Sequence, residues 1–79
     1  MSAERKTHEC LDILRAITLA ATYGKDPTAD EMAYHTGYET AQVLEALLVL
    51  REHRLICSGA GTDRFHPTPL GRMLVKRAK

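Results

Sequence analysis

Residues Thr28 to Ile56 read TADEMAYHTGYETAQVLEALLVLREHRLI, and this stretch decides the fold. Thr28 stands three residues before Glu31, which is the spacing of the reciprocal capping box that starts a helix. Gly37 ends that short helix, because glycine adopts the positive φ that a sharp turn requires. A second helix is predicted from Thr40 to His53. The stretch therefore predicts two helices that meet at a tight turn.

The second of these helices has two different faces when it is placed on a helical wheel. The predicted core side holds Val43, Leu44, Leu47, Leu48 and Leu50, and the opposite side holds Ala41, Gln42, Glu45, Val49 and Glu52. We expect Leu44 and Leu48 to cover the first helix of the chain and widen the core. The alternative is that these two leucines form an exposed surface that binds a partner.

The segment before Thr28 predicts another helix, from about Lys6 to Tyr23. Its apolar residues recur at helical spacing and form one stripe, made of Cys10, Ile13, Leu14, Ile17, Ala20 and Ala21. Gly24 is expected to end this helix. In the short helix that follows, we expect Met32, Ala33 and Tyr34 to turn inward.

The segment after the second helix predicts a β-hairpin over residues 55–67 and then a last helix. Strands are expected at 55–57 and 64–66, joined by the glycine-rich turn 58–63. Thr68 and Pro69 are the preferred residues for the N-cap and first position of a helix. That helix is predicted from Pro69 to the end of the chain, with its apolar side inward at Leu70, Met73 and Leu74.

Length and composition indicate one small domain over residues 1–79, of which 44% are apolar. A chain this short buries about 60% of its unfolded surface, so dimerisation would add useful stability. No apolar run approaches the roughly 20 residues that cross a bilayer, and the first six residues lack the apolar core of a secretion signal. We therefore expect a cytoplasmic protein in which Cys10 and Cys57 are free thiols.

The charges are unevenly distributed, although the net charge is only +1. Residues 1–54 carry six Lys/Arg and nine Asp/Glu, which gives −3, whereas residues 55–79 carry five Lys/Arg and one Asp, which gives +4. On the last helix, Arg72, Lys76 and Lys79 form a basic ridge. A polyanion would be drawn to this C-terminal third; otherwise, the ridge is an ordinary solvated helix face.

The order of elements resembles that of the winged helix-turn-helix transcription regulators, most closely the multiple-antibiotic-resistance regulator type. Five short matches along nearly the whole chain carry the resemblance: Met32-Ala33, Gly37-Tyr38, the apolar set Val43, Leu47 and Leu50, Leu55-Ile56, and Thr68-Pro69-Leu70-Gly71 with Leu74. It implies an α+β, mostly helical fold with a three-helix core, a two-stranded wing and a C-terminal helix.

The resemblance also implies a function, namely sequence-specific binding of double-stranded DNA by a transcriptional regulator. Helix 40–53 would enter the major groove and hairpin 55–67 would act as the wing. The implied base-reading residues are Thr40, Ala41, Gln42 and Glu45, with phosphate contacts from Tyr38 and Thr40 as the alternative. Arg64 would contact the backbone or enter the minor groove, and Arg72 and Lys76 would add phosphate contacts. A homodimer is expected, with Leu11, Leu19 and Val75 in its interface.

The acidic character of helix 40–53 keeps a second function open. Glu45 and Glu52 lie on its exposed side, Glu39 precedes it, and carboxylates near phosphates are repelled. The alternative is a winged helix that binds a protein and no DNA, as an accessory factor or a subunit of a larger assembly.

Catalysis, metal binding and a cofactor are not expected. No nucleophile, base and orienting group occur together in the sequence. His66 is expected near Cys57 across the hairpin, and Cys10 can approach from the first helix. The chain nevertheless lacks the Cys-x-x-Cys and His-x-x-x-His spacings of zinc sites.

Overall fold

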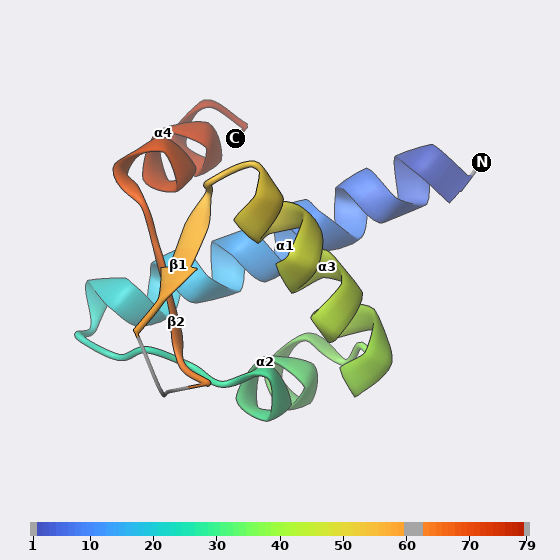
Figure 1. Cartoon of the computed structure of the whole chain (residues 1–79), viewed down its shortest axis with the longest axis horizontal. Coiled ribbons are helices and arrows are strands. Elements are labelled where there is room, and N and C mark those ends of the chain that lie inside the picture. The colour runs from blue at the N-terminus through green and yellow to red at the C-terminus, as the bar shows by residue number, and fades with distance from the viewer. Residues whose placement is uncertain (1, 60–62, 79) are drawn as a thin grey trace.

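The computed structural model describes residues 2–59 and 63–78, which form an α+β, mostly helical domain (Figure 1). The elements within these ranges are α1 (Ser2–Thr22), α2 (Ala29–Thr36), α3 (Thr40–Glu52), β1 (Ile56–Ser58), β2 (Phe65–Pro67) and α4 (Pro69–Arg77). This order is the predicted one, and α2 and α3 begin and end within one residue of the predicted positions.

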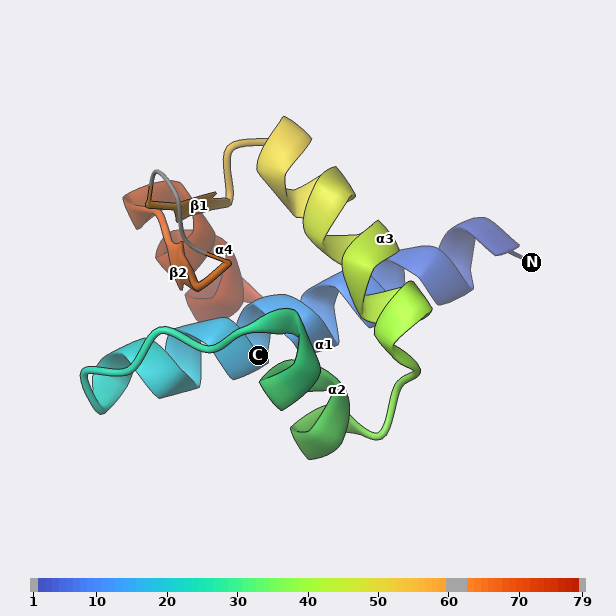
Figure 2. The same cartoon turned by 60° about the horizontal axis from the view of Figure 1, so that its bottom comes forward.

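Helix α1 organises the molecule. It runs along the longest dimension, and α2, α3, the hairpin and α4 pack around it (Figures 1 and 2). Ile13, Leu14 and Ile17 are completely buried, which confirms the centre of the predicted apolar stripe. The other elements bury their own apolar residues against this stripe: Met32 from α2, Val43, Ala46, Leu47 and Leu50 from α3, and Ile56 from β1.

Helix α2 is held at both ends by the predicted residues. The Thr28 hydroxyl accepts a hydrogen bond from the Glu31 amide, and the Glu31 carboxylate accepts one from the Thr28 amide. Gly37 has φ of +82°, and its amide donates to the Ala33 carbonyl, which ends the helix. One prediction for α2 is wrong: Tyr34 is 85% exposed, because the inward side of this short helix is formed by Met32, with Ala29 and Ala33 packed against the core.

The hairpin is antiparallel and pairs Ile56 with Pro67, Cys57 with His66, and Ser58 with Phe65. Both strands therefore begin one residue later than predicted. Leu55 lies outside the strand, because its amide donates to the Leu50 carbonyl near the end of α3. Arg64 forms a separate antiparallel bridge with Thr28. The central turn residues 60–62 lie outside the described ranges.

Thr68 fastens the start of α4 to the exit from α3. Its hydroxyl accepts from the Gly71 amide at 3.1 Å and donates to the Arg54 carbonyl at 2.7 Å. Gly71 lies so close to the Leu55 carbonyl that a Cβ atom there would collide with it. The Thr-Pro-x-Gly sequence thus combines a helix cap, a favourable first residue and a close backbone approach.

The close approach at Gly71 decides which side of α4 faces the core. Gly71 is buried and Val75, one turn later, packs against the core. The prediction that Leu70, Met73 and Leu74 turn inward is therefore wrong, since all three are 42–52% exposed. Hydrophobicity alone predicted that the leucines of α4 face the core, whereas the small residue Gly71 is the one that lets α4 pack closely.

Candidate functional site

The outward side of α3 is the surface that both predicted functions, DNA binding and protein binding, would use. We call it the α3 outer face, and it consists of the exposed residues Ala41, Leu44, Glu45, Leu48 and Glu52. Val43, Ala46, Leu47 and Leu50 hold the opposite side of the helix in the core. These buried residues fix the rotation of α3, so the outer face points to solvent.

The expectation that Leu44 and Leu48 widen the core is wrong. Leu44 is 49% exposed and Leu48 is 64% exposed, although they lie one helical turn apart and so form a continuous apolar strip. Ala46 takes the core position instead, because a small side chain lets α3 pack closely against α1. Val49, predicted on the polar side, also packs partly against the core.

Gln42, which the resemblance places among the base-reading residues, makes two hydrogen bonds within the chain. Its side-chain oxygen accepts from the Glu39 amide at 2.9 Å, and its side-chain nitrogen donates to Glu9 Oε2 at 3.1 Å. Both polar ends of the amide are therefore used within the chain. Gln42 caps the start of α3 and ties it to α1.

Tyr38 is also engaged inside the molecule. Its hydroxyl donates to Asp12 Oδ2 at 2.6 Å. This hydrogen bond, together with desolvation and the charges of Asp12 and Glu9, raises the pKa of Tyr38 to about 12. The side chain is half-buried and links α1 to the turn before α3.

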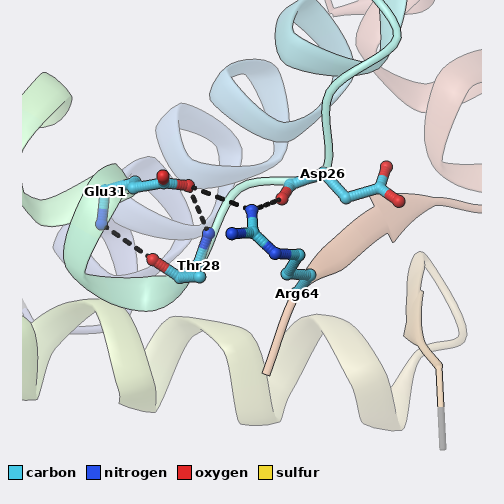
Figure 3. Close-up of polar contacts among 4 residues, drawn as sticks. All are labelled: Asp26, Thr28, Glu31 and Arg64. Atoms are coloured by element: carbon cyan, nitrogen blue, oxygen red, sulfur yellow. Dashed lines mark hydrogen bonds and ion pairs between the residues drawn. The ribbon is translucent and has the colours of Figure 1, made fainter. Parts of the chain in front are cut away.

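Arg64 turns back onto the loop that precedes α2 (Figure 3). Its guanidinium donates to the Asp26 carbonyl at 2.9 Å and lies 3.7 Å from the Glu31 carboxylate. An exposed ion pair of this kind contributes at most about 1 kcal/mol. The pairing nevertheless offsets the positive charge that the implied DNA contact at Arg64 requires.

The remaining residues implied for DNA binding are accessible but do not share one helix. Thr40, Ala41 and Glu45 are exposed on α3, and Arg72 and Lys76 are exposed on α4. Lys79, the last member of the predicted ridge, lies outside the described residues. The exposed carboxylates on α2, on α3 and at their starts are Asp30, Glu31, Glu39, Glu45 and Glu52, and Arg51 is the exposed cation within α3. The α3 outer face is thus acidic and apolar.

A second apolar surface lies between α1, the end of α3 and α4. We call it the α1/α4 groove; it consists of two adjoining hollows of about 590 and 320 Å³ that share His53, Leu55 and Leu74. The larger hollow also reaches Leu11 and Val49. Sequence reasoning missed this groove, because the exposure of Leu74 depends on the rotation that Gly71 imposes on α4.

The three residues expected in a dimer interface do not form one surface. Leu11 lines the α1/α4 groove, whereas Leu19 is 61% exposed and lines a different hollow, between α1 and α2. Val75 packs against the core of its own chain. An interface that combines these three residues stays a prediction.

Across the hairpin, Cys57 Sγ lies 2.9 Å from His66 Nε2, as the sequence predicted. Cys10 is buried on α1, and both cysteines are free thiols. Among the described side chains of residues 7–59 and 63–78, no three His, Cys, Asp or Glu come together in a way that would hold a metal ion. Over the same ranges, no helix has the length and hydropathy needed to span a bilayer.

Comparison with known proteins adds no further assignment. No protein-family model matches the chain, and neither the curated proteins nor the solved structures include a significant match.

Proposed function

We propose that this chain is a winged-helix protein-interaction module that binds a partner protein through the α3 outer face. Hairpin 55–67 takes the place of the wing in this interpretation. The observation that supports it best is the exposure of Leu44 and Leu48 beside Glu45 and Glu52, at the positions where a DNA-reading helix needs polar and basic side chains.

The magnitudes favour a protein over a nucleic acid. Burying a leucine side chain contributes about 1.5–3 kcal/mol, so covering two half-exposed leucines contributes roughly 2–3 kcal/mol. DNA affinity comes mainly from Lys and Arg that displace counterions from phosphates. Tyr38, Gln42 and Arg64 are engaged within the chain, and the carboxylates that remain on the outer face oppose a phosphate backbone.

The chemistry of the face also defines the partner. An apolar strip of two leucines one turn apart fits a helix or loop that presents apolar side chains of its own. Glu45 and Glu52 flank the strip and favour Lys or Arg at the edge of the partner segment. Arg51 borders the face as well and favours one acidic residue there.

Sequence-specific binding of double-stranded DNA, with a role in transcription, is the second candidate. It is favoured by the solvent-exposed start of α3, where Thr40 and Ala41 are both exposed. Arg72 and Lys76 are exposed and available for phosphates. This candidate requires contacts from α4 to outweigh the carboxylates of α2 and α3.

Site-specific photo-crosslinking distinguishes the two candidates. A photoreactive amino acid replaces Leu48 in the cells that express the protein, and the adducts are treated separately with protease and nuclease. We expect protein adducts that disappear when Glu45→Lys and Glu52→Lys are added. The matched control carries the same photoreactive group at Tyr23, which is 72% exposed just after the end of α1 and far from α3 in sequence. Nuclease-sensitive adducts at position 48 would instead establish the DNA-binding function.

A further inference from the structure

The chain carries a second apolar surface whose charge is opposite to that of the α3 outer face. Leu70, Met73 and Leu74 project from α4 beside the α1/α4 groove, and Arg77 lines the smaller hollow with them. Lys76 is exposed on the neighbouring side of the helix. One surface is thus a strip of leucines beside carboxylates, and the other is an apolar groove that has the cation Arg77 in the lining of its smaller hollow.

We propose that the α3 outer face of one copy docks into the α1/α4 groove of a second copy. This inference rests on the proposed protein-binding function and names the partner. Leu44 and Leu48 of one protomer would enter the groove, against Leu74 of its partner. Glu45 and Glu52 of the first protomer would lie toward Lys76 and Arg77 of its partner.

Three properties of the described chain support a second copy as the occupant. The groove is lined almost entirely by apolar atoms and is wide enough, at about 590 Å³ for its main hollow, for leucine side chains. The charges at the edges of the two surfaces are complementary, which is the arrangement that selects partners. The two surfaces also lie next to each other on α3 without sharing a residue, because the groove is lined by Val49 and His53 whereas Leu44 and Leu48 belong to the outer face.

The same two surfaces also predict a closed dimer. A patch and a groove on one chain can join copies head to tail, or twice around a two-fold axis. A stable interface removes about 800 Å² from each partner, and two reciprocal contacts reach this area more readily than one. We therefore expect a dimer in which each protomer supplies one outer face and one groove.

The test is sedimentation equilibrium of the full chain from micromolar to millimolar concentration. The expected mass is twice the 8.8 kDa of the monomer. One variant reverses the outer face (Glu45→Lys with Glu52→Lys), and a second reverses the groove edge (Lys76→Glu with Arg77→Glu). Each alone should weaken the dimer by about tenfold or more, because like charges would face each other.

Mixing the two variants provides the sharpest result. The unaltered groove edge of the first variant then meets the unaltered outer face of the second, and the reversed surfaces are complementary again, so a mixed dimer should return. Asp63→Lys and Lys25→Glu are the control charge reversals, since both residues are exposed and lie on neither surface. Circular dichroism verifies that every variant is folded.

Several outcomes would overturn the self-docking. They are a monomer at every concentration, a mass that continues to rise with concentration, a dimer that tolerates both reversals, or a mixture that stays monomeric. Any of these leaves the proposed function in place if crosslinks from position 48 still join the chain to a different protein. Nuclease-sensitive crosslinks would remove the proposed function itself.

Discussion

The Tyr38 hydroxyl donates a 2.6 Å hydrogen bond to the Asp12 carboxylate and thereby joins the turn between α2 and α3 to the middle of α1. Gln42 forms a parallel link from the first turn of α3 to Glu9, one turn earlier on α1. Together these contacts fix the direction in which α3 leaves the turn. The two polar residues that most resembled DNA contacts therefore orient the helix whose outer face carries the proposed function.

Replacing Tyr38 by Phe should lower the free energy of unfolding by about 1 kcal/mol at neutral pH, because Asp12 loses a hydrogen-bond donor on a half-buried surface. Urea unfolding measures this loss. Thr22→Val is a suitable control, because it removes an exposed hydroxyl that bonds only within α1, and it should change stability less.

The pH dependence of stability tests the same hydrogen bond. The pKa of Tyr38 is raised to about 12 in the folded chain from 10.0, so the contribution is complete below pH 10 and is lost as the pH rises toward 12. Other groups titrate in this range as well, so the informative quantity is the difference between wild type and Tyr38→Phe. That difference should shrink from pH 9 to pH 12; a constant difference would contradict the assigned hydrogen bond.

Replacing Gly71 by Ala should destabilise the fold by about 1–3 kcal/mol, which is the usual cost of forcing extra atoms into a packed site. The new Cβ would collide with the Leu55 carbonyl, a backbone atom that cannot move independently of the hairpin. Arg72→Ala, at the exposed neighbouring position, should stay within about 0.5 kcal/mol of wild type. Equal effects of the two substitutions in thermal unfolding would argue against the close approach of α4.

Arg54 is the non-glycine residue with positive φ among the described residues, at +58°. A side chain in this left-handed region costs roughly 1–2 kcal/mol, and glycine avoids most of that cost while losing some chain entropy. Arg54→Gly should therefore stabilise the protein by about 0.5–1 kcal/mol, seen as a higher urea midpoint with an unchanged m-value. A lower midpoint would show that the arginine side chain contributes more than the backbone strain costs.

Replacing the exposed leucines of α3 should hardly change the stability of the isolated chain. Leu44→Gln combined with Leu48→Gln should change the free energy of unfolding by less than about 1 kcal/mol, because neither side chain is in the core. Leu47→Ala, on the buried side of the same helix, should cost about 2–5 kcal/mol. A large loss from the double glutamine variant would place these leucines in the core and remove the proposed docking strip.

Much of the fold follows from local sequence signals. The Thr28 and Glu31 capping box, the positive φ of Gly37 and the apolar stripe of α1 were all predicted, because each depends on residues a few positions apart. The pairing of Cys57 with His66 followed from the spacing of the hairpin. These features need no knowledge of how the helices pack.

The rotation of α3 and α4 could not be predicted in the same way. Hydrophobicity placed Leu44, Leu48 and Leu74 inside, whereas the structure places small residues, Ala46 and Gly71, at the close contacts. Close packing between elements depends on side-chain volume as well as polarity. The long-range hydrogen bonds of Tyr38, Gln42 and Arg64 to Asp12, Glu9 and Asp26 were likewise missed, because these partners lie at least 26 positions away in sequence.

The most direct test of the central claim, that the α3 outer face binds protein rather than DNA, is a fluorescence anisotropy titration of a labelled mixed-sequence duplex. DNA-binding proteins retain non-specific affinity of about 10⁻⁴–10⁻⁶ M at physiological salt, and this affinity rises steeply as salt is lowered. We predict no saturable binding at either low or physiological salt. Binding that strengthens at low salt, with a salt dependence that weakens by about one unit of slope on Lys76→Ala, would contradict the account.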